Sequence, residues 1–536
     1  MHPFKASIFQ ELDAPFYFKI YLLIVGVILL FSAVYFPITD SDALGSYVAR
    51  FEYQRFGELK NIATLSIQYL FPKTFDWILW QFGHNGYLAG VPTLFCLCLI
   101  LGSCVILLNR SERFWAIALL CSSPLILTQS VSQKNDIALA AFALTGVVAL
   151  LRCTTITGIL ISSLMASLCI GTKWSGICIP VIFVCVQLVM IVKRRLIREA
   201  ITAYSLVFLM APLLFFIASG SSYLENFMHY GTPTPILADV RSVANVPTLK
   251  LNLAVLLGQF YTNTLDVLHV WIELFSKLSH LDLHALLNFH HYFYIFSGLY
   301  TSHAPIGLPL LVIVVLTVCV FFTPLSQDFE IRILALSGML YLIAVLFFLP
   351  IAGGQIRYIL STIILWLPIA ARLLHRWVKQ PAVKHVSCLI ALWISTSVIM
   401  LNNDRTFPQP IFATKDSWIH YAHDHDLLMF LGLPGYIAFF EKFKQEVPLY
   451  KSLALIDNAT QADIDAAEIP TFMPFLVKRS PANTGIWRTR YHDISKKYSD
   501  FDYLLVYTRR GVPMVFPGYR AILDTGWPAL ILYRRN

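Results

Sequence analysis

Carboxylates stand at the ends of long apolar runs in this sequence, where their chemistry would be unusual. Asp40 and Asp42 follow the first apolar run, and Asp136 stands directly ahead of a later one. A charged side chain at the edge of a low-dielectric region is costly, so such residues often form sites. One role would be a general base that takes a proton from a hydroxyl nucleophile. The alternative role is capping of the helix that follows.

Three cations occupy similar positions. Lys134 lies in Ser132-Gln133-Lys134-Asn135-Asp136, Lys173 in Gly171-Thr172-Lys173-Trp174-Ser175-Gly176, and Arg357 in Gly353-Gly354-Gln355-Ile356-Arg357-Tyr358. Arginine offers a planar fork and lysine a point charge to a phosphate. Lys173 could instead snorkel to the membrane interface, and Arg357 could be a surface anchor. Together with a base, these cations would suit transfer of a group away from a lipid phosphate, which leaves ionised and needs neutralisation.

The elements that must position these residues are membrane spans. The chain has 536 residues, of which 57% are hydrophobic and 13% charged, so it lies outside the soluble globular range. Apolar runs long enough to cross a bilayer predict about eleven spans, at 18–36, 87–108, 114–130, 136–152, 154–171, 176–192, 201–219, 305–323, 331–350, 356–374 and 384–401. The first run lacks a cleavage site, so we expect it to be retained.

The distribution of basic residues predicts the orientation. Arg110, Arg113, Arg152, the cluster at 193–198 and the cluster at 372–384 all fall in loops on one side if the N-terminus is cytoplasmic. The positive-inside rule favours that arrangement. The net charge of +9 therefore sets topology, and we expect no nucleic-acid partner. Asp40, Asp42 and the three cations then lie at the exoplasmic ends of spans.

The same topology places the long loops, at about 37–86 and 220–304, on the exoplasmic side. Aromatic residues in the first loop (Phe71, Phe75, Trp77, Trp80 and Phe82) predict helices lying along the interface. In the second loop, residues 251–275 predict either another such helix or a further span. We therefore expect a transmembrane module at 1–401 and an exoplasmic α/β domain at 402–536, with strands at 453–456, 503–507 and 529–533.

The positions of the cysteines and histidines favour neither a metal site nor a set of structural disulfides. The ten cysteines lie in or beside apolar runs, without a metal-ligand spacing that includes histidines. His280 and His284 are one helical turn apart, and His290-His291 follow. This spacing is compatible with a zinc site. We favour histidines at the lipid headgroup level of an interfacial loop, and extend that interpretation to the remaining ones: His229, His269, His303, His420, His423 and His425.

Four short motifs resemble those of the GT-C glycosyltransferases, in the branch of the protein O-mannosyltransferases and the aminoarabinose transferases of lipid A. They are Asp42-Ala43-Leu44 with Arg50, Glu52 and Tyr53 following, the stretch 132–142, Gly171-Thr172-Lys173-Trp174, and Arg357-Tyr358. The motifs cover the membrane part in the family's order. Ser46-Tyr47 departs from a Tyr-His pair common in relatives, so the resemblance does not support a role for a first-loop histidine here.

The resemblance implies an integral membrane enzyme that moves a sugar from a polyprenyl-phosphate donor to an acceptor hydroxyl with inversion, on the periplasmic or lumenal face. It implies Asp42 as the base with Asp40 as a helper, Asp136 as a second acidic position, and Lys173, Arg357 and Lys134 as the phosphate-binding cations. Arg50, Glu52 and Tyr358 are further candidates. Neither a cofactor nor a divalent metal is expected. A bacterial plasma membrane is the expected location.

Two other functions remain open from the sequence. A transporter or lipid-linked glycan flippase would line a substrate path with the same charges. A ligase that transfers a preassembled glycan would share the phosphate site. The clustering of charges at one membrane face and the appended soluble module favour the glycosyltransferase over a transporter. The sugar and the acceptor, which could be a lipid, a glycan or a protein, are not specified by these residues.

Overall fold

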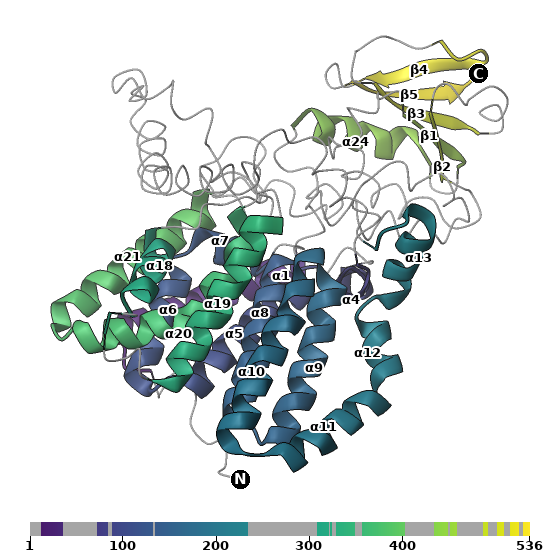
Figure 1. Cartoon of the computed structure of the whole chain (residues 1–536). Helices are drawn as coiled ribbons and strands as arrows, with labels where there is room; N and C mark the ends of the chain where they lie inside the picture. The colour runs from purple at the N-terminus through teal and green to yellow at the C-terminus, as the bar shows by residue number, and fades with distance from the viewer. Residues whose placement is uncertain are drawn as a thin grey trace. The chain divides into compact units, whose positions relative to one another are not determined.

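The structure is a computed structural model that describes residues 12–35, 72–83, 88–131, 135–233, 308–320, 322–323, 328–348, 356–401, 434–448, 451–457, 486–490, 501–508, 515–524 and 529–536. The chain divides into two compact units. The larger takes its described residues from 1–33, 72–75 and 90–407, and the smaller from 34–71, 76–89 and 408–536. Figure 1 labels the elements of both.

The larger unit is a helical bundle, and every apolar run predicted as a span contains a helix. Its helices are α1 (Phe16–Tyr35), α5 (Val91–Leu107), α6 (Arg110–Cys121), α7 (Pro124–Gln129), α8 (Asp136–Arg152), α9 (Thr155–Thr172), η4 (Trp174–Ile177), α10 (Cys178–Arg194), α11 (Ile197–Leu209), α12 (Ala211–Ile217), α13 (Gly220–Tyr230), α18 (Leu308–Val320), α19 (Phe329–Phe348), η7 (Ile356–Ile359), α20 (Leu360–Trp377) and α21 (Pro381–Leu401). Within the predicted first loop the structure describes one helix, α4 (Thr74–Gly83), which begins in this unit. Its position along the membrane interface stays a prediction. Residues 251–275 lie outside the described part of the chain.

Five described helical segments are long and apolar enough to cross a membrane, and the pair α11 and α12 makes a sixth if it counts as one span. The five are 16–35, 155–172, 174–193, 329–347 and 357–377. The other helices are shorter. The polytopic membrane fold predicted from composition is therefore confirmed, and the number of spans stays a prediction.

Two predicted spans are not single helices. The run 114–130 breaks into α6 and α7 because Ser123 caps α7, its hydroxyl accepting a hydrogen bond from the Ile126 amide, and Pro124 follows at the first helical position. The run 201–219 breaks into α11 and α12, which are bent by 65°. Pro212 sits at the start of α12, where it cannot donate a backbone hydrogen bond to the preceding turn. A hydropathy value averaged over a window of residues does not detect such breaks.

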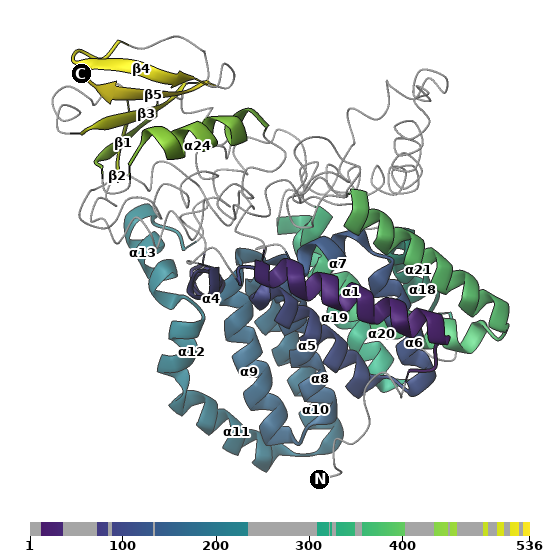
Figure 2. The same ribbon diagram turned by 180° about the vertical axis from the view of Figure 1, so that it is seen from behind.

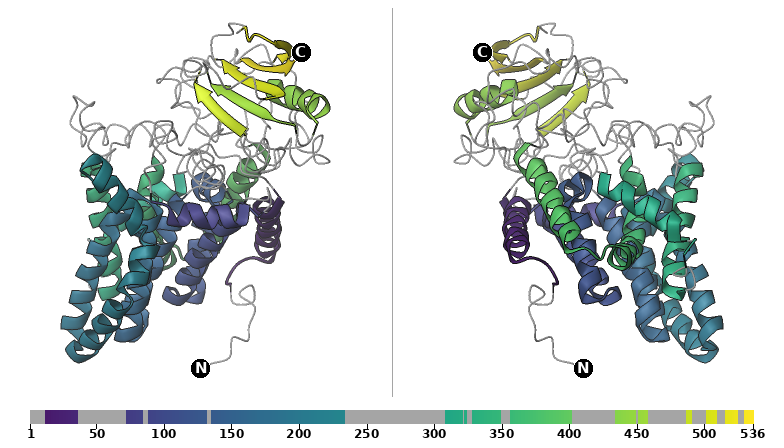
Figure 3. Two further views of the ribbon diagram at one scale, coloured as in Figure 1. Left: turned by 90° about the vertical axis from the view of Figure 1, so that its right-hand side faces the viewer. Right: turned by 90° about the vertical axis from the view of Figure 1, so that its left-hand side faces the viewer.

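Helix α20 lies in the core of the bundle, and 78% of its apolar window is buried. Gly338 of α19 allows the close approach of α20, because a Cβ there would lie 2.3 Å from the Trp366 ring nitrogen. That nitrogen donates a hydrogen bond to the Ala335 carbonyl at 3.1 Å. Helix α1 lies on the outside of the bundle beside α21 (Figures 2 and 3), where the Tyr21 hydroxyl pairs with that of Ser395.

The smaller unit contains a five-stranded sheet of order β2-β1-β3-β5-β4 with α24 (Pro434–Glu446) against it. The strands are β1 (Leu453–Asp457), β2 (Ile486–Arg490), β3 (Tyr503–Thr508), β4 (Tyr519–Asp524) and β5 (Ala529–Arg535). Strands β1, β2 and β3 run parallel, and β5 is antiparallel to both β3 and β4. The three strands predicted from sequence are β1, β3 and β5, at the centre of the sheet. The two that the sequence missed are its edges, where charged residues weaken the apolar pattern.

Candidate active site

Three of the predicted site residues come from separate helix junctions. Asp136 is the first residue of α8, Lys173 lies between α9 and η4, and Arg357 lies in η7 just before α20. The antiparallel pair α8 and α9 brings the first two together. The Asn135 side-chain amide donates a hydrogen bond to the Thr172 carbonyl at 3.1 Å, which fastens the start of α8 to the end of α9.

The carboxylate of Asp136 is shared by the two cations. Its Oδ1 forms an ion pair with Lys173 Nζ, and its Oδ2 lies 3.5 Å from Arg357 Nε. The side chains of Asp136, Lys173 and Arg357 are 3%, 11% and 9% exposed. Lys173 Nζ also lies 4.0 Å above the centre of the Tyr358 ring, as expected for a cation–π contact. The structure therefore brings together four of the predicted residues in one buried cluster, the Asp136 cluster.

The charges of this cluster favour an anion. Two cations and one carboxylate leave a formal charge of +1 in a site with little water, where charge interactions are stronger than in bulk solvent. A phosphate group carries the opposite charge, and the guanidinium and ammonium groups are its usual partners. The cluster can bind a phosphate and can hold the negative charge that develops on it when a bond breaks.

Small residues shape the turn that carries Lys173. A Cβ on Gly171 would lie 2.2 Å from the Ile217 carbonyl oxygen, and one on Gly176 would lie 2.0 Å from the Cys169 carbonyl oxygen. Both positions therefore require glycine, because backbone atoms cannot move aside easily. The Tyr223 hydroxyl donates to the Ile170 carbonyl at 2.9 Å, which fixes the end of α9 from the other side.

Sequence reasoning missed Tyr341, which is fully buried in α19. Its hydroxyl lies near Ser175 of η4, Ser361 of α20 and Asp136, without a hydrogen bond to any of them. Tyr341 therefore lies near both junctions that carry Lys173 and Arg357. No pattern in the sequence could find it, because it stands within an unbroken apolar run and these neighbours are more than 15 residues away.

The remaining predicted residues lie outside the described part of the chain. These are Asp40, Asp42, Arg50, Glu52 and Lys134, so the assignment of the base stays a prediction. Most histidines proposed as possible zinc ligands lie outside it too. Among the described residues, no group of three His, Cys, Asp or Glu side chains could hold a metal ion.

A second charge cluster lies at the other end of α8. Arg372 pairs with Glu330 at 2.9 Å and donates to the Leu107 carbonyl at 2.9 Å, while Arg152 pairs with the same glutamate at 2.9 Å. The 17 residues of α8 separate this end from Asp136 by about 24 Å along the helix axis. Arg113 lies at the same end of the bundle, where its Nε donates to the Leu108 carbonyl at 3.0 Å. The structure thus gathers basic residues from several predicted inner loops at the end opposite the Asp136 cluster.

Comparison with solved structures identifies this arrangement of helices and sheet. The crystal structure of ArnT from Cupriavidus metallidurans bound to undecaprenyl phosphate is similar, with a TM-score of 0.53, 10% identity, and coverage of 96% of this chain and 97% of that one. The chain has the fold of ArnT. The apo-state structure of ArnT from the same organism gives a TM-score of 0.49, 11% identity and the same coverage. No protein-family model matches the sequence, and no match was found among curated proteins.

The fold predicted from the sequence, a polytopic helical membrane module with a small C-terminal α/β domain, is confirmed by this likeness. Since 10% identity is too low to carry over an activity, the likeness establishes the fold alone. Function must be argued from the site.

Proposed function

We propose that this protein is a membrane glycosyltransferase that moves a hexose or pentose from a polyprenyl-phosphate donor to an acceptor hydroxyl. The observation that carries the proposal is the pairing of Lys173 and Arg357 on one buried carboxylate at one end of the bundle. A second support is the ArnT fold, because ArnT has been solved with undecaprenyl phosphate bound. A phosphate on a lipid chain would reach such a site from the bilayer.

The reaction would be a single displacement at the anomeric carbon. The acceptor oxygen forms the new bond on the face opposite the phosphate, and its proton passes to Asp42, with Asp40 beside it. The bond between the anomeric carbon and the phosphate oxygen breaks, and its electron pair stays on the phosphate. The configuration at the anomeric carbon inverts. Lys173 and Arg357, with Lys134 as a further cation, hold the departing phosphate, so no separate general acid is needed.

Asp136 has a different role from Asp42 in this mechanism. Because its two oxygens face Lys173 and Arg357, its charge offsets their mutual repulsion and keeps them at fixed positions. A phosphodiester donor carries one negative charge, which matches the +1 of the cluster. The phosphate monoester that leaves carries more, and the preorganised cations hold this product charge more strongly than the substrate charge.

We infer the orientation of the enzyme from its two charge clusters. Arg152, Arg372 and the other basic residues share the end opposite Asp136, which favours a cytoplasmic location for that end. The Asp136 cluster would then face the periplasm or lumen, in a bacterial plasma membrane. The module at 402–536 would lie on the exoplasmic side as well.

The test is a reconstituted transfer assay with polyprenyl-phosphate sugars of differing head group. Asp42→Asn should bind polyprenyl phosphate and lose transfer, whereas Lys173→Gln and Arg357→Gln should lose binding as well. Arg376→Gln, a change of the same kind at an exposed position near the opposite end, is the control and should keep both. Wild-type turnover in Asp42→Asn would exclude the base assignment. Transport of the lipid-linked sugar by Asp42→Asn, without transfer, would favour a flippase.

The sugar and the acceptor must be identified in cells that produce the protein. Mass spectrometry of glycans, glycolipids and glycoproteins from a deletion strain should show the loss of one sugar modification. Restoration by the wild-type gene and failure of Asp42→Asn to restore it would link the modification to this reaction. Transfer of a whole oligosaccharide in the same experiment would identify a ligase.

A further inference from the structure

The turn between α10 and α11 is an exposed basic surface. Residues 193–199 contain four basic side chains and one acidic one, Glu199. Lys193 contacts the Phe329 ring, with its Nζ 3.3 Å from the ring centre. Arg195, Arg198 and Glu199 are exposed. The net charge of this turn is positive, so it attracts anions at the end of the bundle opposite the Asp136 cluster.

The backbone of this turn holds an arginine where glycine is favoured. Arg195 ends α10 in the left-handed conformation, with φ 54° and ψ 36°. Glycine is the usual residue at such a position because a Cβ is strained there. Because this conformation is strained for arginine, Arg195 is a candidate for a residue whose charge has a function.

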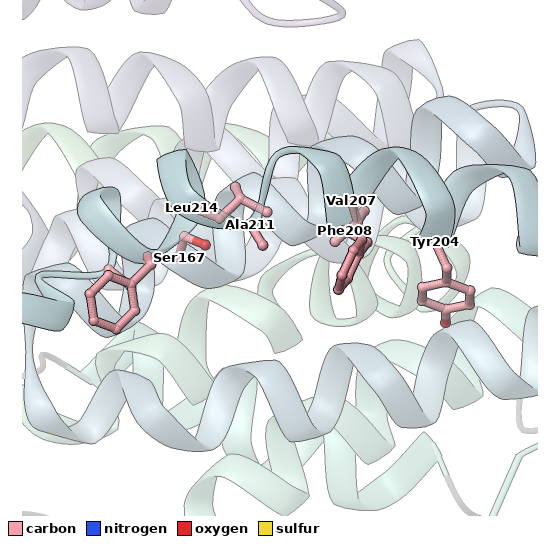
Figure 4. Close-up of a pocket in the computed structure, with 8 residues that line it drawn as sticks. Ser167, Tyr204, Val207, Phe208, Ala211 and Leu214 are labelled. Atoms are coloured by element: carbon pink, nitrogen blue, oxygen red, sulfur yellow. The ribbon is translucent and has the colours of Figure 1, made fainter.

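An apolar groove begins one helical turn beyond Arg198. It has a volume of about 530 Å³ and is lined by α11 residues Ile201, Tyr204, Ser205, Phe208 and Leu209. A second hollow of about 470 Å³ shares Tyr204 and Phe208 and continues past the bend to Ala211 and Leu214 of α12, with Ser167 of α9 opposite (Figure 4). Both hollows are predominantly apolar.

The two polar side chains that α11 contributes to the groove already have partners. The Tyr204 hydroxyl donates to Gln187 Oε1 at 2.8 Å, and the Ser205 hydroxyl donates to the Ile201 carbonyl at 3.0 Å. The groove therefore presents a surface suited to hydrocarbon, without a polar atom that requires a polar ligand. Ile201 and Phe208 are 63% and 79% exposed along it.

The distance from Arg198 to the far part of the groove is similar to the thickness of one lipid leaflet. Arg198 and Phe208 are ten residues apart on one helix, which is about 15 Å, and half of a bilayer core is also about 15 Å. An anionic head group at Arg195 and Arg198 would place its acyl chain along Ile201 to Leu209. The chain would end near the bend between α11 and α12.

We propose that Arg195, Arg198 and the apolar groove of α11 form a binding site for an anionic glycerophospholipid of the leaflet at this end of the bundle. The arginines bind the phosphate, and the groove holds an acyl chain. The site is separate from the Asp136 cluster and does not depend on the proposed transfer reaction. A bound lipid would stabilise the packing of α11 and α12 against α9.

The experiment measures thermal unfolding of the full-length purified protein with added phosphatidylglycerol or phosphatidylcholine of identical acyl chains. Phosphatidylglycerol should raise the melting temperature of the wild type more than phosphatidylcholine does. The double variant Arg195→Gly/Arg198→Gln should lose most of that difference. Arg195→Gly alone should melt in detergent at or above the wild-type temperature, because glycine relieves the backbone strain. A weaker response to lipid can then be distinguished from a loss of folding.

The control is Arg376→Gln/Lys379→Gln, which removes one exposed charge from the last turn of α20 and one from the residues just after it. This variant should keep the wild-type response to phosphatidylglycerol. An equal loss in the control, or equal effects of the two lipids on the wild type, would overturn the proposal. In native mass spectrometry, displacement of bound phosphatidylglycerol by polyprenyl phosphate would assign the groove to the latter lipid and would overturn it as well.

Discussion

The Asp136 cluster makes a quantitative prediction about stability. Asp136→Asn keeps the shape of the side chain but removes the charge that Lys173 and Arg357 share, so the formal charge changes from +1 to +2. Removal of one partner from a buried ion pair costs about 3–5 kcal/mol, because the remaining charges stay desolvated. We expect Asp136→Asn to lower the free energy of unfolding by an amount in this range.

A double-mutant cycle isolates the electrostatic part of that loss. Asp136→Asn/Lys173→Met removes one cation along with the carboxylate, so the double variant should be destabilised by less than the sum of the two single variants. For residues in direct contact, the coupling is about 0.5–3 kcal/mol. The assay is equilibrium unfolding in mixed micelles, followed by tryptophan fluorescence.

The matched control is a pair at a more exposed position. Lys73 and Glu225 are 2.9 Å apart, with side chains 23% and 53% exposed. Glu225→Gln should therefore cost about 0–1 kcal/mol, as is usual for exposed pairs. Equal losses for Asp136→Asn and Glu225→Gln would refute the reasoning that burial makes the Asp136 cluster costly to disturb.

Three further predictions concern other parts of the bundle. Arg372→Gln should lower stability while leaving donor binding unchanged, measured by unfolding and by lipid binding, because Arg372 joins α5 and α19 at the end opposite the site. Gly171→Ala should cost about 1–3 kcal/mol by overpacking, whereas Gly102→Ala, with open space around it, should be neutral or stabilising. The hydrogen bond from Lys384 lowers the pKa of Asp13 below its usual 3.8. This pair therefore stabilises the fold above pH 3.8, and its contribution is lost as the pH falls through the lowered pKa. Melting curves between pH 7 and pH 3 should show this loss of stability in the wild type and not in Lys384→Met.

The sequence by itself determined the class of protein and the position of its helices. Apolar runs of about 20 residues have few stable alternatives to helices in a bilayer, and each predicted run contains one. The polar residues left at the ends of those runs, Asp136, Lys173 and Arg357, could be selected because such positions are costly for charge. The central strands β1, β3 and β5 were found for a similar reason, since buried strands have continuous apolar patterns.

Only the tertiary structure decided which of these residues meet. The shared carboxylate between Lys173 and Arg357 depends on the register of α8, α9 and α20, and close packing at Gly171 and Gly338 helps to set that register. The burial of Tyr341 and the bend between α11 and α12 could likewise not be predicted from the sequence. Hydropathy is summed over residues that are neighbours in the sequence, so it carries no information on the distances between helices. Helix positions follow from local solvation, whereas the site follows from packing between distant segments.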